Sequence, residues 1–256
     1  MPGLSGKVVF ITGSSGGIGR ATALEFAGNG ADVILQYRSK INDAEAIASE
    51  IEKLGRRARA VRIDFSNICE APAQVEFGVK EAIGEFGKID VLVNLAGYPA
   101  KGEWDKKFLE LTVEDFYKPI NVDLLGAFLC ARSVAPHMIS QKNGVIVNIS
   151  STPALAGHDR GLAFTVAKAG IIGLTKGLAT ELAPHIRVNA IALGNVETTW
   201  ISELNNKELN EARQENLMKR FGSPREIAKI IVFLAGDESS FLTGQTIVVD
   251  GGTVLH

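Results

Sequence analysis

Three glycines early in the chain have a spacing that suits phosphate binding. Gly13, Gly17 and Gly19 follow the apolar run 8–11 and precede a stretch whose apolar residues recur at helical spacing. Such a loop turns tightly, lets the backbone approach a pyrophosphate and directs helix N-terminal amides at its charge. Between a first strand and a first helix, this spacing favours a dinucleotide site over a plain turn. The predicted loop comprises Gly13, Ser14, Ser15, Gly17, Ile18 and Gly19.

The residues after the second apolar run indicate which nucleotide the loop would bind. A site for NAD(H) places an acidic residue here to bind the ribose 2′-hydroxyl, and residues 36–40 (QYRSK) contain none. Arg38 and Lys40 could instead bind a 2′-phosphate, with Ser39 as a further hydrogen-bond donor. We therefore expect NADP(H), bound near Tyr37, Arg38 and Ser39, with NAD(H) as the second choice. A solvated loop is the alternative interpretation of the same cations.

An aromatic ring and an amine share one helix face later in the chain. Phe164 and Lys168 are four positions apart, so a helix brings their side chains together. A phenylalanine ring can neither give nor take a proton. The chain has two tyrosines outside the predicted cofactor strand, Tyr98 and Tyr117, and His158 could titrate near neutral pH. The ordinary interpretations are a pocket-wall aromatic for Tyr98 and a surface or substrate-contacting side chain for His158.

The apolar runs of the chain predict the frame that holds these groups. The runs are apolar on both faces, which is typical of parallel strands covered by helices on each side. Between them lie stretches of helical periodicity, such as 18–29 and 44–54. The alternation predicts an α/β fold, a three-layer, doubly wound, Rossmann-like single domain over residues 1–256 with a seven-stranded parallel sheet. The predicted strands are 8–11, 33–35, 60–63, 91–93, 145–149, 188–191 and 246–249.

The segment 195–220 interrupts this regular alternation. It is polar, rich in Asn, Glu and Lys, and lies between the sixth and seventh predicted strands. A mobile lid over a substrate pocket is one interpretation, and a solvated surface insertion is the other. Directly after it, Ser223, Pro224 and Glu226 occupy the cap, first and third positions of a predicted helix.

Composition and charge exclude several classes of protein. The net charge of −2 offers no basic stripe for nucleic acid. The two cysteines, Cys69 and Cys130, have no metal-ligand spacing, so we expect no metal site and a reducing compartment. The N-terminus has no apolar signal core, and we expect no apolar run long enough to span a bilayer. These features favour a soluble cytoplasmic protein.

Taken together, the motifs resemble the short-chain dehydrogenase/reductase family over essentially the whole chain, and most of all its 3-oxoacyl-ACP reductases. The set of motifs is far more specific for this fold than any one of them. The matching residues are 12–19 (TGSSGGIG), Asp64, 94–97 (NLAG), 121–123 (NVD), 148–151 (NISS), Lys168, Gly194 with Thr198, 242–245 (LTGQ) and 250–252 (DGG).

The resemblance implies a catalytic group of Asn, Ser, Tyr and Lys. By position these are Asn121, Ser151 and Lys168, with Phe164 in place of the tyrosine. In the family the tyrosine transfers the proton, the serine bonds the substrate oxygen, the lysine holds the nicotinamide ribose, and the asparagine supports a water. Loss of a general acid typically lowers the rate about 10²–10⁴-fold, so we expect an impaired or rearranged proton step. The resemblance places Tyr98 beside the active site and His158 in a substrate-binding loop, which makes them weak candidate substitutes for the phenol.

The resemblance also assigns further binding residues. Two positions depart from the family pattern, since Leu95 replaces an asparagine and Leu193 replaces a proline. Asp64 and Phe65 follow the third predicted strand, where an acid and an apolar ring could hold the edge and the face of an adenine. The cofactor contacts that the resemblance implies beyond the glycine loop and the ribose are Asp64, Asn94, Ala96, Gly97, Lys168, Gly194, Val196 and Thr198. The implied substrate contacts are Ser151, Pro153, His158 and Trp200.

Three functional hypotheses fit these residues. The first is an NADP(H)-dependent oxidoreductase that acts on a carbonyl or alcohol substrate, including an acyl thioester. The second is an NADP(H)-binding protein without catalysis. The third is an engineered variant in which Phe164 replaces the tyrosine of an active reductase. Small residues in 164–183, together with the assembly of look-alikes, imply a homotetramer or homodimer.

Overall fold

A parallel sheet forms the centre of the molecule. The computed structural model of the chain describes residues 3–99, 102–199, 201 and 204–255. The sheet has seven strands in the order β3-β2-β1-β4-β5-β6-β7, all of them parallel. They are β1 (Val8–Ile11), β2 (Asp32–Tyr37), β3 (Ala58–Arg62), β4 (Val91–Asn94), β5 (Gly144–Ser151), β6 (Ile186–Leu193) and β7 (Thr246–Val249). The predicted fold class and each predicted strand are confirmed.

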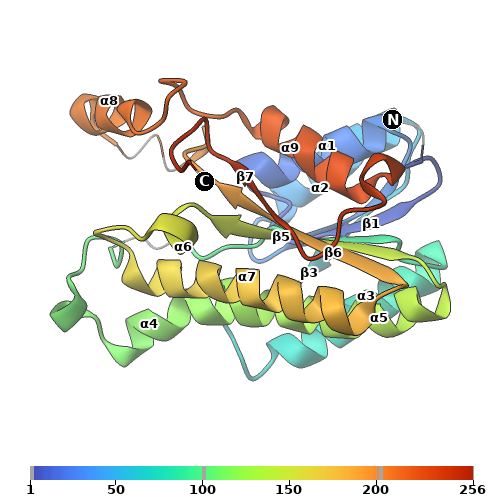
Figure 1. Cartoon of the computed structure of the whole chain (residues 1–256). Helices are drawn as coiled ribbons and strands as arrows, with labels where there is room; N and C mark the ends of the chain where they lie inside the picture. The colour runs from blue at the N-terminus through green and yellow to red at the C-terminus, as the bar shows by residue number, and fades with distance from the viewer. Residues whose placement is uncertain (1–2, 100–101, 200, 202–203, 256) are drawn as a thin grey trace.

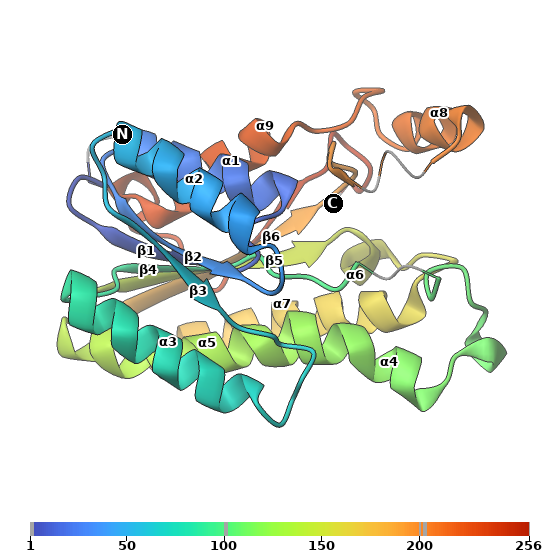
Figure 2. The ribbon, with the colours of Figure 1, turned by 180° about the vertical axis from the view of Figure 1, so that it is seen from behind.

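Helices cover both faces of the sheet, as Figures 1 and 2 show. One face carries α1 (Gly17–Gly28), α2 (Ile41–Lys53) and α9 (Pro224–Ala235). The other carries α3 (Ala71–Phe86), α4 (Val113–Pro119), α5 (Gly126–Ser140) and α7 (Leu162–Leu182). The short α6 (Pro153–Ala156) follows β5, and α8 (Asn206–Gln214) lies in the segment between β6 and α9.

The core consists of two apolar layers, one on each face of the sheet. Because neighbouring residues of a strand point to opposite faces, Val9 and Phe10 of β1 enter different layers, and both are fully buried. Val9 packs in the layer that holds Phe26 of α1 and Ile231 of α9. Phe10 packs in the layer that holds Val134 of α5. Burial on both sides explains why the strand sequences are continuously apolar.

The strand order reverses between β1 and β4, which places a crevice at their carboxyl ends. In open α/β sheets, ligands bind at such a switch point. Thr12, directly after β1, fixes the two loops that border it, because its Oγ1 accepts hydrogen bonds from the backbone N–H of Leu95 at 2.9 Å and of Ala96 at 3.0 Å. These hydrogen bonds hold the glycine loop after β1 against the loop after β4.

Two helical stretches, 113–140 and 162–182, are long and apolar enough to cross a membrane by length and composition. This finding corrects the expectation that no such run exists. The first stretch is 56% buried and the second 33% buried within the window that passes the test. Both lie along one face of the sheet (Figures 1 and 2), and core helices of soluble proteins pass the same test. The low buried share of the second stretch shows that α7 keeps an apolar face open to the outside.

The segment 195–220 leaves the sheet at the carboxyl end of β6 and contains α8, at the upper left of Figure 1. The cap of α8 is Asn205, whose side chain accepts from the backbone of Glu208, and Glu208 in turn accepts from Asn205 N–H. Ser223 and Glu226 form the same reciprocal cap at α9, as predicted. The role of 195–220 as a lid stays a prediction.

Candidate active site

The glycine loop after β1 has the geometry that a close backbone approach requires. Gly13 has a φ of +64°, and a Cβ there would lie 2.8 Å from the Cα of Ala96. A Cβ on Gly19 would lie 2.3 Å from the carbonyl oxygen of Gly13, so no larger residue fits. Gly17, at the start of α1, is exposed at the crevice. These glycines form a cradle that fits a pyrophosphate group at a helix N-terminus.

Gln36 of β2 holds this loop in place, and the sequence analysis did not assign it that role. Its side chain accepts from Gly13 N–H at 2.7 Å and donates to the carbonyl of Ile63 at 2.7 Å. Its own carbonyl accepts from the Ser14 hydroxyl at 2.8 Å. The Ser14 hydroxyl is buried and engaged within the fold, so it supports the shape of the loop. The sequence does contain a signal for this role, because Gln36 is an amide residue directly after the apolar run 33–35.

The end of the site nearest β2 and β3 carries exposed cations. Arg38 and Ser39 are exposed, directly after the buried Tyr37 that ends β2. Arg62, the last residue of β3, donates from Nε to the carbonyl of Arg38 at 3.2 Å. Lys40 lies 3.7 Å from Asp43 across exposed side chains. Arg62 is a further cation at this corner that the sequence analysis missed, since only the pairing of β2 with β3 reveals it.

Asp64 and Phe65, after β3, have separate roles. Asp64 Oδ1 accepts from the backbone and the hydroxyl of Ser66, at 3.0 and 2.5 Å, so its carboxylate is held in a turn beside the crevice. Phe65 is only 4% exposed and packs in the core, where a Cβ on Gly126 would lie 3.0 Å from its ring. Burial thus gives the Phe65 ring a structural role in the helix layer, and its contact with an adenine face stays a prediction.

Asn94 begins a buried polar chain beneath the crevice. Its Nδ2 donates to Asn148 of β5 at 2.9 Å, and Asn148 donates to the hydroxyl of Thr175 on α7 at 2.9 Å. The Oδ1 atom of Asn94 is buried without a hydrogen-bond partner. An orphaned acceptor at a crevice is a group that a bound hydroxyl would satisfy. Leu95, at the departing position, packs against the apolar layer instead.

Lys168 is buried on α7, and two oxygens hold its amine. Its Nζ donates to the carbonyl of Ile149 at 3.0 Å and lies 3.0 Å from Oδ2 of Asp123. The Asp123 side chain is fully buried, and its Oδ1 accepts from Tyr98 N–H at 2.6 Å. Asp123 lies in the π-helical turn Ile120–Leu125 between α4 and α5.

The same turn holds Asn121, two positions before Asp123. The resemblance gives Asn121 the support of a water rather than a direct contact with the lysine, and its catalytic role stays a prediction. Asp123 is the residue of this turn that contacts Lys168, and the sequence analysis did not assign it a role.

Ser151 ends β5, and its hydroxyl donates to the carbonyl of Leu193 at 3.2 Å. The side chain must rotate away from that bond to donate to a substrate. Gly194 follows at the end of β6, where a Cβ would lie 2.7 Å from Asp250. Leu193, in the place of the family's proline, is 8% exposed and packs in the core. The turn after β6 is therefore closely packed despite this departure.

Phe164 lies on α7 one turn before Lys168, as the spacing predicts. The Lys168 Nζ is 5.6 Å from the centroid of its ring, and the Trp104 ring meets it edge to face at 5.5 Å. A cavity of about 10 Å³ beside this ring is lined by Phe164, Tyr98, Glu103 and other residues. A cavity of that size can hold about one water. The tyrosine position is thus filled by an apolar ring packed between a tryptophan and an amine.

Neither predicted substitute for the phenol is free in this arrangement. The Tyr98 hydroxyl donates to Glu103 Oε1 at 3.1 Å. Burial raises the pKa of Tyr98, and the hydrogen bond to Glu103 raises it further, which makes the phenol a weaker acid. His158 accepts from Arg160 N–H through Nδ1 at 3.1 Å, and its ring lies 5.5 Å from that of Trp104. Both residues lie beside Trp104, and both are engaged in contacts within the fold.

The carboxamide end of the predicted cofactor site lies after Gly194. A Cβ on Gly17 would lie 3.5 Å from the side chain of Thr198, so Thr198 faces the glycine loop. Val196 pairs with Gly222 in an isolated bridge at the base of the segment 195–220. Gly97 also borders the site, because its Cβ position lies 3.6 Å from the Asp123 carboxylate. Pro153 starts α6, and Trp200 lies outside the described residues.

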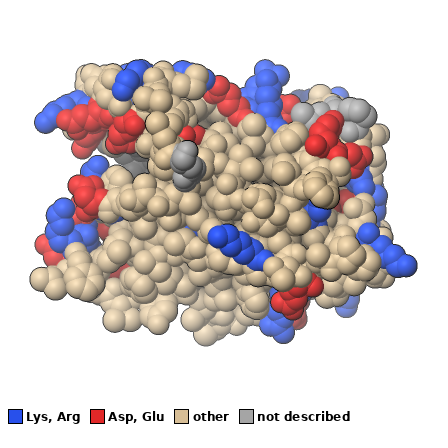
Figure 3. All heavy atoms as spheres, in the orientation of Figure 1, with Lys and Arg blue, Asp and Glu red and all other residues tan. Residues whose placement is uncertain are grey.

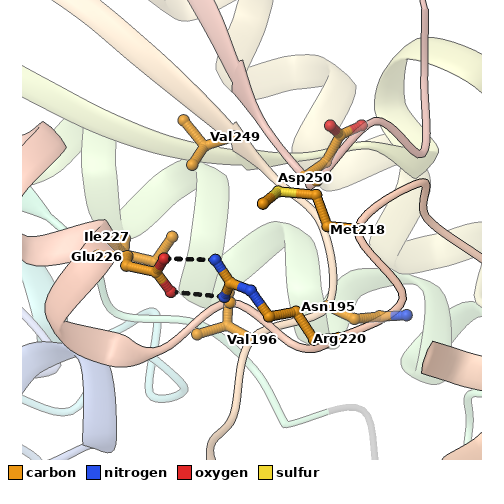
Figure 4. Close-up of a pocket in the computed structure, with 10 residues that line it drawn as sticks. Asn195, Val196, Met218, Arg220, Glu226, Ile227, Val249 and Asp250 are labelled. Atoms are coloured by element: carbon orange, nitrogen blue, oxygen red, sulfur yellow. Dashed lines mark hydrogen bonds and ion pairs between the residues drawn. The ribbon is translucent and has the colours of Figure 1, made fainter.

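A larger cavity of about 110 Å³ lies behind Val196, at the base of the same segment. Figure 4 shows Arg220 and Glu226 on one side of it, joined by an ion pair with two contacts of 2.7 and 2.9 Å. Val249 and Asp250 border the opposite side. The Asp250 carboxylate is already engaged within the fold, since it accepts hydrogen bonds from the backbone N–H of residues 252 and 254.

Among the described residues, no cluster of three acidic, His or Cys side chains could hold a metal.

The fold, the glycine cradle and the buried lysine define a nicotinamide-dependent oxidoreductase scaffold. A family model described as enoyl-(acyl carrier protein) reductase matches residues 13–254. The chain belongs to the short-chain dehydrogenase/reductase family of oxidoreductases.

Among individual proteins, the chain is 41% identical over 253 residues to the 3-oxoacyl-[acyl-carrier-protein] reductase of Thermotoga maritima, covering 98% of this chain and 99% of that one. The structure of NAD⁺-bound xylitol dehydrogenase superposes with a TM-score of 0.89 at 31% identity, covering 97% and 99% of the two chains. A short-chain dehydrogenase from Burkholderia cenocepacia in complex with NADP gives 0.86 at 31% identity, covering 98% of each. One of these related structures thus contains NAD⁺ and the other contains NADP.

Proposed function

We propose that this protein is an NADP(H)-dependent oxidoreductase for a carbonyl or alcohol substrate, of the 3-oxoacyl-ACP reductase kind, with an impaired or rearranged proton step. One observation carries the proposal. Lys168 is buried and held by fixed oxygens, Ser151 ends the strand that supplies one of them, and the residue one turn before the lysine is Phe164. The residues that would bind the cofactor and orient the substrate are present, whereas the residue that would act as the acid is replaced.

The choice of NADP(H) rests on the cations at the ends of β2 and β3. Arg38 has an exposed side chain, and Arg62 is tied to its carbonyl. A 2′-phosphate needs such charge-assisted donors, while a 2′-hydroxyl needs an acid that residues 36–40 lack. The glycine cradle fits a pyrophosphate equally for both cofactors, so the specificity lies at this corner.

The proton step follows from what the side chains can do. The cofactor would supply the hydride. Ser151 would turn its hydroxyl from Leu193 to the substrate oxygen and polarise it, and Lys168 would donate to the ribose. Phe164 supplies no proton, so the proton must come from a slower route. Tyr98 is the nearer candidate by its shared cavity with Phe164, although its raised pKa disfavours it.

The substrate class rests on relationship and on the walls of the site. The Thermotoga maritima protein is named for 3-oxoacyl-ACP, which is a 3-oxoacyl thioester. Trp104 and Phe164 pack edge to face beside Lys168 and form an apolar wall, which suits an acyl chain or another apolar ketone. The segment 195–220 would close over such a substrate as a lid, with the cavity behind Val196 at its base.

We also propose that the protein assembles as a homotetramer or homodimer. Figure 3 shows a broad face with few charges over α7 and the C-terminal segment. Leu162 and Val166 of α7 are 39% and 38% exposed there, and a Cβ on Gly173 or Gly177 would meet nothing within 4 Å. Phe241, before β7, is fully exposed. An apolar face with open glycines lets a second copy approach closely.

The expected compartment is the cytoplasm. Cys69 and Cys130 are both free thiols, as is usual where disulfides are reduced.

The test of the proposed function is binding and turnover with both cofactors. NADPH and NADH affinities are measured by fluorescence, and oxidation of each is followed over a panel of ketones and 3-oxoacyl thioesters. The proposal expects NADPH to bind more tightly and to be oxidised slowly with at least one substrate. Tight NADPH binding with no turnover on any substrate would favour a cofactor-binding protein instead. Preference for NADH would refute the cofactor assignment.

A further inference from the structure

The buried carboxylate of Asp123 has no part in the function proposed so far. Its side chain is fully buried, and its partner Lys168 is 8% exposed. Oδ2 lies 3.0 Å from the lysine Nζ, and Oδ1 accepts from the Tyr98 N–H. Oδ1 is thus held by a hydrogen bond and Oδ2 by the ion pair alone. Burial raises the pKa of the Asp123 carboxyl, and the charge of Lys168 opposes that rise.

A buried pair of this kind is unfavourable unless each charge has its partner. Taking an ammonium out of water is strongly unfavourable, and removing only one member of a buried pair leaves an uncompensated charge. Ile149 gives Lys168 one neutral acceptor, and the ring of Phe164 offers only its π-face at 5.6 Å. Among the described residues, Asp123 is the anion in contact with this amine.

The position of the pair relates it directly to residue 164. Lys168 contacts Asp123 on one side and faces the Phe164 ring on another. A phenol at 164 would place a second ionisable oxygen near the same ammonium group, and its anion would compete with the carboxylate for that charge. The two positions, 123 and 164, are thus alternative sources of negative charge for one lysine.

We propose that Asp123 is a positioning residue that holds Lys168 toward the ribose and neutralises its charge, and that positions 123 and 164 are energetically coupled through that lysine. The first half rests on the proposed function, whereas the coupling does not. While Asp123 carries its charge, the lysine lowers the pKa of a phenol at 164 only weakly. Removing the carboxylate should therefore lower the pKa of such a phenol further.

The test introduces a phenol and changes only its neighbour's charge. Phe164→Tyr is titrated by ultraviolet difference absorbance against the parent chain, and Phe164→Tyr/Asp123→Asn against Asp123→Asn, so that any change at Tyr98 cancels and the new phenol is isolated. Opposite charges within about 4–6 Å shift a pKa by about 1–3 units. The phenol should accordingly ionise at a pH at least about one unit lower in the Asp123→Asn background. No cofactor or substrate is needed for this readout.

Other ionisable groups near the ring stay constant between the two variants. Glu103 and Asp115 line the cavity beside Phe164, and Lys118 bonds both of them at 2.9 and 3.1 Å. Lys106 also pairs with Asp115, and His158 lies beyond the Trp104 ring. Phe164→Tyr/Asp43→Asn is the matched control, because it makes the same change of net charge on the exposed start of α2.

A second variant tests the same coupling if Asp123→Asn does not fold. In Phe164→Tyr/Lys168→Met the carboxylate remains without its cation, so the phenol should ionise at a higher pH than with Phe164→Tyr alone. Equal phenol pKa values with and without Asp123, or with and without Lys168, would overturn the coupling. An equal shift in the Asp43→Asn control would also overturn it, because the effect would then be one of net charge. NADPH turnover is measured separately, so its absence would count against the proposed function alone.

Discussion

The ring of Phe164 lies 5.6 Å from the Nζ of Lys168, one helical turn away on α7. This contact shields the amine from solvent but transfers no proton. The family scaffold is therefore retained around the position from which its acid is missing. The consequences can be measured in cofactor binding, at the base of the segment 195–220, on the exposed apolar face of α7 and at residue 164 itself.

Arg38→Ala should separate the two nicotinamide cofactors. A hydrogen bond to a charged group contributes about 1.5–3 kcal/mol, so NADPH affinity should fall about tenfold to a hundredfold. NADH affinity should change less than about threefold, since NADH has no 2′-phosphate to lose. Both constants come from fluorescence titration, with Arg20→Ala as the control because Arg20 is exposed and pairs with Glu50. An equal fall for both cofactors would mean that Arg38 does not read the 2′-phosphate.

Gly19→Ala should disrupt the phosphate loop. The new Cβ would lie 2.3 Å from the Gly13 carbonyl oxygen and 2.7 Å from the Ser14 Cα, both backbone atoms that cannot rotate away. Overpacking of this kind costs about 1–3 kcal/mol, and we expect NADPH affinity to fall at least about tenfold because the loop must move. Gly28→Ala is the matched control on the same helix, since a Cβ there meets nothing within 4 Å. Unchanged NADPH binding in Gly19→Ala would contradict the cradle.

Glu226→Gln should remove one source of acid sensitivity. Hydrogen bonds from Arg220 and from Ser223 lower the pKa of Glu226 to about 2, from 4.5 in the unfolded chain. Because the folded pKa is the lower one, the stabilisation is fully present above pH 4.5 and is lost as pH falls toward 2. The parent chain should therefore lose melting temperature faster than Glu226→Gln across that window. Parallel melting curves of the two proteins against pH would rule this out.

Val166→Glu should break the assembly. Val166 is 38% exposed on the apolar face of α7, and a buried carboxylate in a subunit interface has no partner there. Sedimentation velocity should show a smaller species than the parent chain, with unchanged far-ultraviolet circular dichroism. Ile68→Glu, at a 49% exposed position before α3, is the control. A parent chain that is already monomeric, or a Val166→Glu variant of unchanged size, would refute the interface.

The sequence predicted the sheet and the glycine loop because both depend on local patterns. Strand runs are apolar on both faces, and Gly13 and Gly19 are required by backbone contacts that their spacing already implies. The cap of α9 at Ser223 is likewise a local pattern, and its hydrogen bonds match the prediction.

The parts that sequence could not predict depend on contacts between distant elements. Phe65 follows a strand, as a residue that covers an adenine would. Its ring packs in the core against Gly126, a contact between distant parts of the chain. Asp123 contacts Lys168 of a helix that lies more than 40 residues further along the chain, and the local sequence of its turn does not indicate that ion pair. Arg62 joins the cofactor corner only through the pairing of β3 with β2.

The most direct test of the account compares the parent chain with Phe164→Tyr in NADPH oxidation over 3-oxoacyl thioesters and ketones. A general acid contributes about 10²–10⁴-fold, and the account predicts a gain of that order in kcat with little change in NADPH affinity. Phe164→Ser, which also adds a hydroxyl but no phenol, should show no such gain. Equal turnover of the parent chain and Phe164→Tyr would contradict the account, because the proton would then come from another residue.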